Sequence, residues 1–410
     1  MQKILIKNIK GLVQYGENLP AVRKGEEMKE LPILENAFLA IEDGEIIAYG
    51  SMDDWDGITD WRDLEVIDAE GKFVLPAFCD SHTHTVFAQA REEEFVDRIN
   101  GLTYEDIALK GGGILNSARR LQEMSEDELF SNAKKRIERL MSYGTGALEI
   151  KSGYGLSVEA ELKMLRVIKR LKNECPIDIK ATFLGAHAFP PEYKMNHRGY
   201  IDLIINEMIP KIQEENLADY IDVFCENNYF SVDEMEEILL AGIAIGLQPK
   251  VHVNQFSALG GVKKAVELNA LSVDHLEEIS AEDIEALKGS ITMPTILPSC
   301  SHFLSIPFGD AKRLMENDLP VALASDFNPG STPSGNLSFV WSLACVKMKM
   351  TPEEALNALT INAAYAMGLS STHGTITMGK KTPIILTKRI PSLAYIPYSF
   401  GDQLIERLII

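Results

Sequence analysis

The sequence predicts an α/β protein in which a (β/α)8 TIM-type barrel carries a small β-sandwich domain formed by both chain ends. Three observations lead to this fold class. Eight apolar runs alternate with helix-like stretches through the middle of the chain. Both chain ends instead alternate apolar and polar residues. Finally, polar residues that can bind metals or take part in catalysis recur where the apolar runs end. An open, doubly wound sheet also fits this pattern, because sequence order does not report closure.

The chain ends are typical of short strands. Residues 3–14, 36–50 and 63–78 alternate apolar and polar side chains, with turn signals at Asp43-Gly44 and Glu70-Gly71. Alternation returns in the tail, over residues 373–400. We therefore expect a small β-domain from residues 1–72 and 371–410, and a barrel hydrolase domain from residues 73–370.

The predicted barrel strands are buried apolar runs. Stretches such as 125–144 and 157–174 lie between them, and they begin with Ser and carry acidic residues in their first turn, as helix starts do. The eight runs cover residues 72–82, 145–152, 177–187, 220–227, 248–255, 270–277, 290–297 and 319–326.

Composition excludes several classes of protein. The net charge of -20 argues against nucleic acid as a partner, because its phosphates require a basic surface. An anionic substrate would then need a locally positive pocket. No run of about 18 apolar residues predicts a membrane span, and the start of the chain lacks the apolar region of a signal peptide. Five dispersed cysteines without CxxC spacing indicate a reducing compartment, so we expect a cytoplasmic protein.

Polar residues gather at the carboxyl ends of the predicted strands, where barrel enzymes place their catalytic groups. The first strand ends at His82 and His84, which project to the same face because alternate residues of a strand do so. Imidazoles with one carboxylate suit zinc or iron. An H-x-H pair alone is weak support for a metal site, but its repetition on other strands strengthens it. Those strands end at His187, His252, His275 and Asp326.

Longer motifs carry a family resemblance. The run "VLPAFCDSHTHTVFA" resembles the first-strand metal motif of the amidohydrolase superfamily. Together with "EIKSGYGL", "FLGAHAFPPEY", "HVNQFSALGG", "LSVDHLEE" and "ALASDFNPGS", it closely resembles the imidazolonepropionase family over essentially the whole chain. The resemblance implies metal-dependent hydrolysis of the cyclic C–N bond of 4-imidazolone-5-propanoate to N-formimidoyl-L-glutamate, in histidine degradation. It also implies a homodimer.

The resemblance assigns roles residue by residue. It implies one divalent metal ion, zinc or iron, held by His82, His84, His252 and Asp326. It implies that His275 faces the metal-bound water or the carbonyl under attack and that Asp326 also accepts a proton, so both are expected to be catalytic. The substrate pocket is expected to contain Arg91, Tyr104, Tyr154, His187, Asn328 and Gly330.

Arg91 suits the propanoate carboxylate because a guanidinium binds carboxylates through two hydrogen bonds. The alternative for this arginine is a surface ion pair with Glu92, Glu93 or Glu94.

One departure concerns catalysis. Many family members carry a glutamate where this chain has Gln255, and an amide does no acid-base work. Gln255 stays among the expected catalytic residues: either His275 and Asp326 suffice for the proton transfers, or Gln255 only orients the substrate through hydrogen bonds. Two alternatives remain at this point: another amidohydrolase acting on a related heterocycle, and a non-catalytic binding protein. A two-metal hydrolase would need a lysine on the fourth strand, which residues 220–227 lack.

Overall fold

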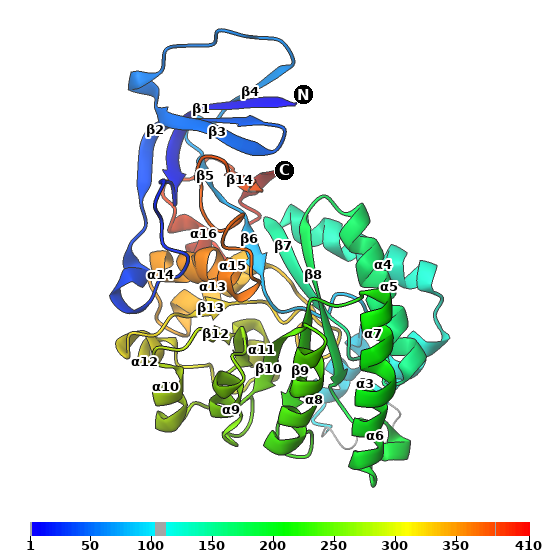
Figure 1. The fold of residues 1–410 in the computed structure, drawn as a ribbon. Coiled ribbons are helices and arrows are strands. Elements are labelled where there is room, and N and C mark those ends of the chain that lie inside the picture. The colour runs from blue at the N-terminus through cyan, green and yellow to red at the C-terminus, as the bar shows by residue number, and fades with distance from the viewer. Residues whose placement is uncertain (1, 103–111, 382) are drawn as a thin grey trace.

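The computed structural model describes residues 2–102, 112–381 and 383–410 (Figure 1). A barrel of parallel strands and helices makes up the larger part, and a sheet containing both termini lies at one end of it. The barrel strands run with their carboxyl ends away from that sheet, so residues that follow these strands collect at the far end. The candidate site lies there.

Eight parallel strands form the barrel, and consecutive strands in the chain are neighbours in the sheet. Each coincides with one of the eight predicted runs, and their residues are buried apart from Asp178, Lys180 and Gln248 near two strand starts. They are β6 (Phe78–Asp80), β7 (Thr145–Lys151), β8 (Asp178–Ala186), β9 (Tyr220–Cys225), β10 (Gln248–Val253), β11 (Ser272–His275), β12 (Met293–Ile296) and β13 (Ala322–Leu323).

Backbone contacts between the first and last strands close the barrel. Thr83 forms a parallel bridge with Phe327 just beyond β6 and β13. The Asp326 amide donates to His82 O at 3.0 Å, and the His84 amide donates to Phe327 O at 2.8 Å. These bonds decide against the open sheet. They also place two predicted metal ligands opposite a third.

Helices pack outside the strands, and sequence signals locate several of their starts. Ser125, Ser231 and Ser280 form capping boxes, in which each serine and an acidic residue three positions later satisfy free backbone amides. Ser157 caps a fourth helix. The helices of this part are α1 (Glu92–Ile99), α3 (Gly113–Glu123), α4 (Glu126–Ser142), α5 (Val158–Glu174), α6 (His197–Leu203), α7 (Ile209–Glu215), α8 (Val232–Ala244), α9 (Gly261–Glu267), α10 (Ala281–Leu287), α11 (Pro298–Leu304), α12 (Ala311–Glu316), α13 (Leu337–Val346), α14 (Pro352–Leu359) and α15 (Ile361–Ala366).

Strands from both chain ends form one seven-stranded sheet with its own hydrophobic cluster. Its order is β15-β14-β5-β1-β2-β3, with β4 paired to β1. The run predicted as the first barrel strand is divided between the two sheets, because β5 pairs with β14 whereas β6 pairs with β7. The strands are β1 (Lys3–Val13), β2 (Ile33–Glu42), β3 (Glu45–Ser51), β4 (Leu64–Asp68), β5 (Phe73–Pro76), β14 (Ile384–Thr387) and β15 (Ile405–Ile409), and α16 (Tyr395–Tyr398) lies between the last two.

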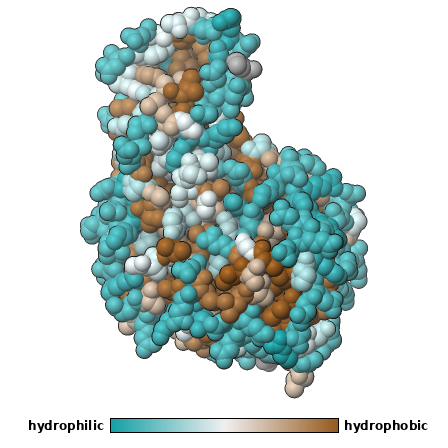
Figure 2. Space-filling view, in the orientation of Figure 1, coloured by the Kyte–Doolittle hydropathy of each residue, from teal (hydrophilic) through white to brown (hydrophobic). Residues whose placement is uncertain are grey.

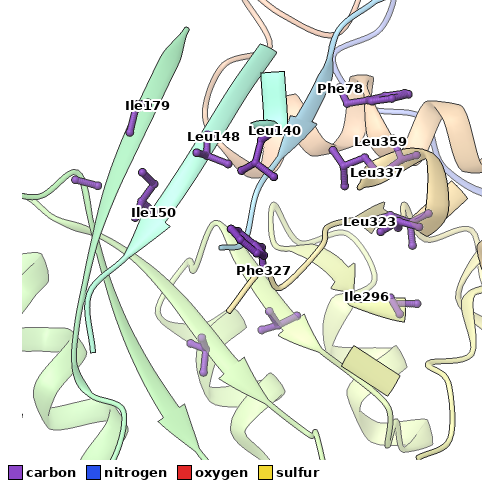
Figure 3. Packing of buried hydrophobic residues seen from close by; sticks show 14 of the residues in the cluster. Phe78, Leu140, Leu148, Ile150, Ile179, Ile296, Leu323, Phe327, Leu337 and Leu359 are labelled. Carbon is purple, nitrogen blue, oxygen red and sulfur yellow. The ribbon is translucent and has the colours of Figure 1, made fainter. Parts of the chain in front are cut away.

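The main hydrophobic core fixes the last barrel strand. Phe327 lies in the middle of the cluster drawn in Figure 3, below Leu140, and is 6% exposed. Its ring also packs edge-on against Phe87 at 5.8 Å. Because Phe327 follows Asp326 directly, this packing holds the Asp326 backbone, which has a left-handed φ of 57°.

The visible surface is mostly hydrophilic, with hydrophobic residues gathered towards the lower middle of the barrel part (Figure 2). This agrees with a chain in which charged residues make up 24%. Within the described ranges, no helix has the length and apolar character needed to cross a membrane.

Candidate metal and substrate site

Five histidines converge at the carboxyl ends of the barrel strands. His82 and His252 have ring centroids 4.3 Å apart, and His84 lies 5.5 Å from His82. His275 lies 5.4 Å from His252, while His187 stacks on His84 at 5.3 Å. Strands far apart in the sequence therefore meet in one cluster, as their positions at strand ends predicted.

Three of these histidines and Asp326 have the spacing of ligands around one metal ion. Asp326 Oδ1 lies 3.6 Å from His82 Nε2 and 3.6 Å from His84 Nε2. Two ligands of a tetrahedral zinc ion, each about 2.1 Å from it, are about 3.4 Å apart. The side chains of His82, His84 and His252 also offer donor atoms within 4.8 Å of one another. The residues fit a divalent metal ion.

Unsatisfied nitrogens support the same interpretation. The Nε2 atoms of His82 and His252 are buried and have no hydrogen-bond partner among the described residues. Buried polar atoms normally have a partner, and each exception needs an explanation. Here both atoms face the space between the strand ends. A bound cation would satisfy them.

Two buried aspartates orient the rings of two predicted ligands. His82 Nδ1 lies 2.7 Å from Asp274 Oδ2, and His252 Nδ1 lies 2.8 Å from Asp222 Oδ2. An Nδ1–H that donates to a carboxylate leaves the Nε2 lone pair free for a metal. The sequence prediction missed both aspartates. A signal existed, since each interrupts an otherwise apolar strand core.

Buried lysines balance these carboxylates. Lys151 Nζ lies 2.6 Å from Glu149 Oε1, 2.8 Å from Asp222 Oδ2 and 3.6 Å from Asp274 Oδ2. Lys250 bonds to the other oxygen of Glu149. Burial alone would raise the pKa of Asp222, but His252 and Lys151 lower it below the usual aspartate value. Asp222 therefore remains charged and accepts the Nδ1–H of His252.

Burial also keeps His82 and His84 neutral. It lowers the pKa of His82 well below 6.5, and the nearby charge of Lys151 lowers it further. Burial together with His187 does the same for His84. Neutral imidazole is the form that ligates metals. For Asp326, burial raises the pKa above the usual aspartate value, although His275 opposes this.

His275 differs from the ligand histidines because a carboxylate faces it. Its Nδ1 lies 3.5 Å from Glu277 Oε2. Burial would lower the pKa of His275, but Glu277 raises it above 6.5 overall. His275 is therefore suited to donate a proton or hydrogen bond towards a developing negative charge. The sequence prediction did not identify Glu277 as its partner.

Two adjoining cavities lead to the cluster. The inner one, of about 60 Å³, is lined by Asp326 and by four of the five histidines, His84, His187, His252 and His275. The outer one, of about 200 Å³, includes Arg91, Arg98 and Gly330. Of the residues predicted to bind substrate, Tyr154, His187 and Asn328 line both, as does Gln255. Tyr104 lies outside the described residues.

The outer cavity contains the local positive charge that an anionic substrate would need in this acidic protein. Arg91 Nη2 pairs with Glu94 Oε2 at 2.5 Å, so the ion pair considered for this arginine does form. Both side chains are only 11% exposed, however, and Arg91 still borders the cavity. Arg98 was missed. It follows Arg91 by seven residues, which places both on one face of the segment containing α1.

The loop after Asp326 shapes this cavity around Arg91. A Cβ atom at Gly330 would lie 2.5 Å from Arg91 Nη1, so a larger residue would displace the guanidinium. The Asn328 side chain holds the loop: its Oδ1 accepts from the Gly330 amide at 2.8 Å, and its Nδ2 donates to Asp326 O at 2.7 Å. Asn328 thus connects Asp326 to the arginine side of the cavity.

Comparisons with known proteins agree with this geometry. Residues 230–402 match the model of the Amidohydrolase family. The chain is 60% identical over 406 residues to a Flavobacterium johnsoniae protein named imidazolonepropionase, covering 99% of this chain and 98% of that protein. It is 43% identical over 385 residues to an imidazolonepropionase from Clostridium tetani, covering 94% and 92%.

Two solved structures show the same fold at low sequence identity. A guanine deaminase from E. coli has a TM-score of 0.74 at 13% identity and covers 100% of this chain and 99% of its own. An adenosine deaminase from Xanthomonas campestris with bound zinc has a TM-score of 0.71 at 12% identity, covering 100% and 92%. At such identities, the similarity supports the barrel and the end sheet.

Proposed function

This chain belongs to the imidazolonepropionase family of amidohydrolases, and on that premise we propose a role for each side chain of its site. The protein is a hydrolase of histidine degradation that opens the cyclic C–N bond of 4-imidazolone-5-propanoate to give N-formimidoyl-L-glutamate. Family membership does not favour the deaminase, cyclic amidohydrolase or binding-protein alternatives.

The proposal assigns one divalent metal ion, zinc or iron, to His82, His84, His252 and Asp326. The observation that carries it is the 3.6 Å spacing of Asp326 Oδ1 from Nε2 of both His82 and His84. Supporting it, Asp274 and Asp222 direct the Nε2 lone pairs of two ligands into one space. When bound there, the ion lowers the pKa of a water molecule towards neutrality and polarises a carbonyl.

Arg91 and Arg98 bind the propanoate group. Both border the outer cavity, which joins the inner cavity through shared lining residues. A carboxylate held by the arginines would therefore direct the attached ring inward, towards the histidines. Tyr154 and His187 form a side of that path, with their rings 5.4 Å apart in an edge-on arrangement. These rings orient the substrate ring and exclude water.

Protons move through Asp326 and His275. Asp326 Oδ1 faces the ligand histidines, whereas its Oδ2 lies 3.4 Å from Ser331 Oγ and is directed to the cavity side. Oδ2 accepts a proton from the attacking water and later gives it to the leaving ring nitrogen. His275 stabilises the negative charge that develops on the ring carbonyl oxygen, because Glu277 favours its protonated form.

Gln255 orients the substrate through its amide. It is 9% exposed, lines both cavities, and its Nε2 lies 3.5 Å from Cys300 Sγ. An amide neither gives nor takes a proton in this pH range. The acid-base work therefore falls to Asp326 and His275.

The assembly and compartment complete the proposal. We assign a cytoplasmic homodimer, on the resemblance to the family. All five cysteines are free thiols, which suits a reducing compartment.

Following the absorbance of imidazolonepropionate with purified protein tests the function. Protein loaded with one equivalent of zinc should consume the substrate. Metal-free protein and the Asp326→Asn variant should not, and added zinc should restore only the metal-free wild type. Failure of the zinc-loaded wild type, correctly folded by circular dichroism, to consume substrate would overturn the assignment.

A further inference from the structure

A second group of metal-type donors lies beside the first. Among the residues that the structure describes, two such groups occur: His82 with His84 and His252, and His275 with Glu277 and Cys300. The donor atoms of the second group all lie within 4.8 Å of one another, and all three residues are buried. We propose that this second group is a separate site for a thiophilic divalent cation, such as zinc or cadmium, and that its occupation inhibits the enzyme.

The spacing of two donors suits a cation better than a hydrogen bond. His275 Nδ1 and Glu277 Oε2 are 3.5 Å apart, at the outer limit of a hydrogen bond. Two such ligands of one tetrahedral zinc ion are separated by about 3.4 Å. Both atoms are buried and have no hydrogen-bond partner among the described residues. A cation placed between them would satisfy both.

The two donors are held in place before any ion binds. The other oxygen of Glu277, Oε1, accepts from Ser301 Oγ at 3.0 Å, which leaves Oε2 directed at His275. The backbone between them takes left-handed φ values of 94° at His275 and 62° at Leu276. Such conformations are uncommon for residues other than glycine and persist only where the surroundings enforce them. The site is therefore preorganised.

Cys300 decides which cation the site selects. It lies in the first turn of α11 and is fully buried. A thiolate with an imidazole and a carboxylate selects zinc or cadmium over magnesium or calcium. Binding releases the thiol proton and the Nδ1 proton to solvent, because only deprotonated ligands bind the cation. None of the other four cysteines joins such a group in the described chain.

Occupation of this site would withdraw His275 from catalysis. Its Nδ1 would bind the cation in place of a proton, so the ring could no longer form the imidazolium that stabilises the negative charge on the substrate oxygen. Gln255, which contacts Cys300 Sγ at 3.5 Å, connects the site to the substrate cavity. The inhibition rests on the proposed function, whereas the binding of a second cation does not.

Cadmium titration of protein that already holds one zinc equivalent tests the binding. Wild type should take up one cadmium equivalent and show a sulfur-to-cadmium charge-transfer band in the ultraviolet. Cys300→Ser should lose the band and bind cadmium at least tenfold more weakly, and Glu277→Gln should also bind it more weakly. The control Cys345→Ser should match wild type. Wild type without a second equivalent, or Cys300→Ser with unchanged binding, would overturn the proposal.

Zinc inhibition tests the consequence in the same preparations. Excess zinc should inhibit wild type and Cys345→Ser, whereas Cys300→Ser should need at least tenfold more zinc to lose half of its own uninhibited rate. Equal inhibition of wild type and Cys300→Ser would overturn the inhibitory role. No turnover at any zinc concentration, with the cadmium band intact, would overturn the proposed function and leave the cation site standing.

Discussion

His275 Nδ1 faces Glu277 Oε2 across 3.5 Å at the end of β11, and both side chains are buried. The relationship gives this histidine a higher pKa than His82 and His84, although all three share one cluster. Environments that shift the pKa values of neighbouring groups in opposite directions identify distinct chemical roles. We therefore interpret His82 and His84 as neutral metal ligands. We interpret His275 as the group that stabilises the negative charge developing on the substrate.

Replacing Glu277 by Gln should lower the pKa of His275, because the amide no longer stabilises the imidazolium. The limb of the kcat/KM–pH profile that reports His275 should therefore move to lower pH, and kcat should fall. Glu277→Asp keeps the negative charge, so it should partly restore both the position of this limb and kcat. An unchanged profile in Glu277→Gln, with the metal content of wild type, would separate Glu277 from catalysis.

Replacing Asp274 by Asn should weaken metal binding, because His82 loses the acceptor that fixes its Nδ1–H. Loss of such an outer partner costs about 10–100-fold in metal affinity. Chelator competition with zinc measures the dissociation constant directly. Asp283→Asn is the matched control, since Asp283 is also buried but caps α10. Equal zinc affinity in Asp274→Asn and wild type would contradict the orienting role.

Replacing Arg91 by Ala should raise KM about 10–100-fold with a smaller effect on kcat, since a hydrogen bond to a charged group contributes about 1.5–3 kcal/mol. Steady-state kinetics measure the effects on KM and kcat separately. Gly330→Ala should raise KM as well, because its Cβ would displace the guanidinium. The exposed Arg119 provides the control, as Arg119→Ala removes a charge outside the two cavities. A normal KM in Arg91→Ala would exclude Arg91 as the carboxylate anchor.

Replacing Gln255 distinguishes orientation from acid-base catalysis. Gln255→Ala should raise KM by about 2–10-fold, the effect of a hydrogen bond worth 0.5–1.5 kcal/mol. Gln255→Glu should leave kcat within a factor of about three, if Asp326 and His275 already move the protons. A tenfold gain in kcat for Gln255→Glu would instead mean that a missing carboxylate limits the wild type.

The sequence predicted the strands and their polar ends because these features are local. Eight apolar runs became eight barrel strands, and His82, His84, His252 and Asp326 met at one end. Closure of the barrel could not be predicted from local sequence, because it depends on the backbone hydrogen bonds of Asp326 and His84 to the opposite strand. The apolar pattern also could not predict that residues 73–80 are divided between two sheets, because either sheet would bury that run.

Residues that act through another residue were the hardest to predict. Asp274 and Asp222 are recognisable as polar residues within apolar strands, but only the fold shows which histidine each contacts. Cys300 gave no signal in the sequence, because it lies alone on a short helix. Its relevance comes from the turn that brings His275 and Glu277 beside it.

The proposed function depends on a first metal ion that is held by three histidines and Asp326. X-ray absorption spectroscopy of protein loaded with one zinc equivalent tests it most directly. We expect a first shell of nitrogen and oxygen alone, at about 2.0–2.2 Å. A sulfur scatterer at about 2.3 Å would contradict it, because the ion would then occupy the Cys300 site first.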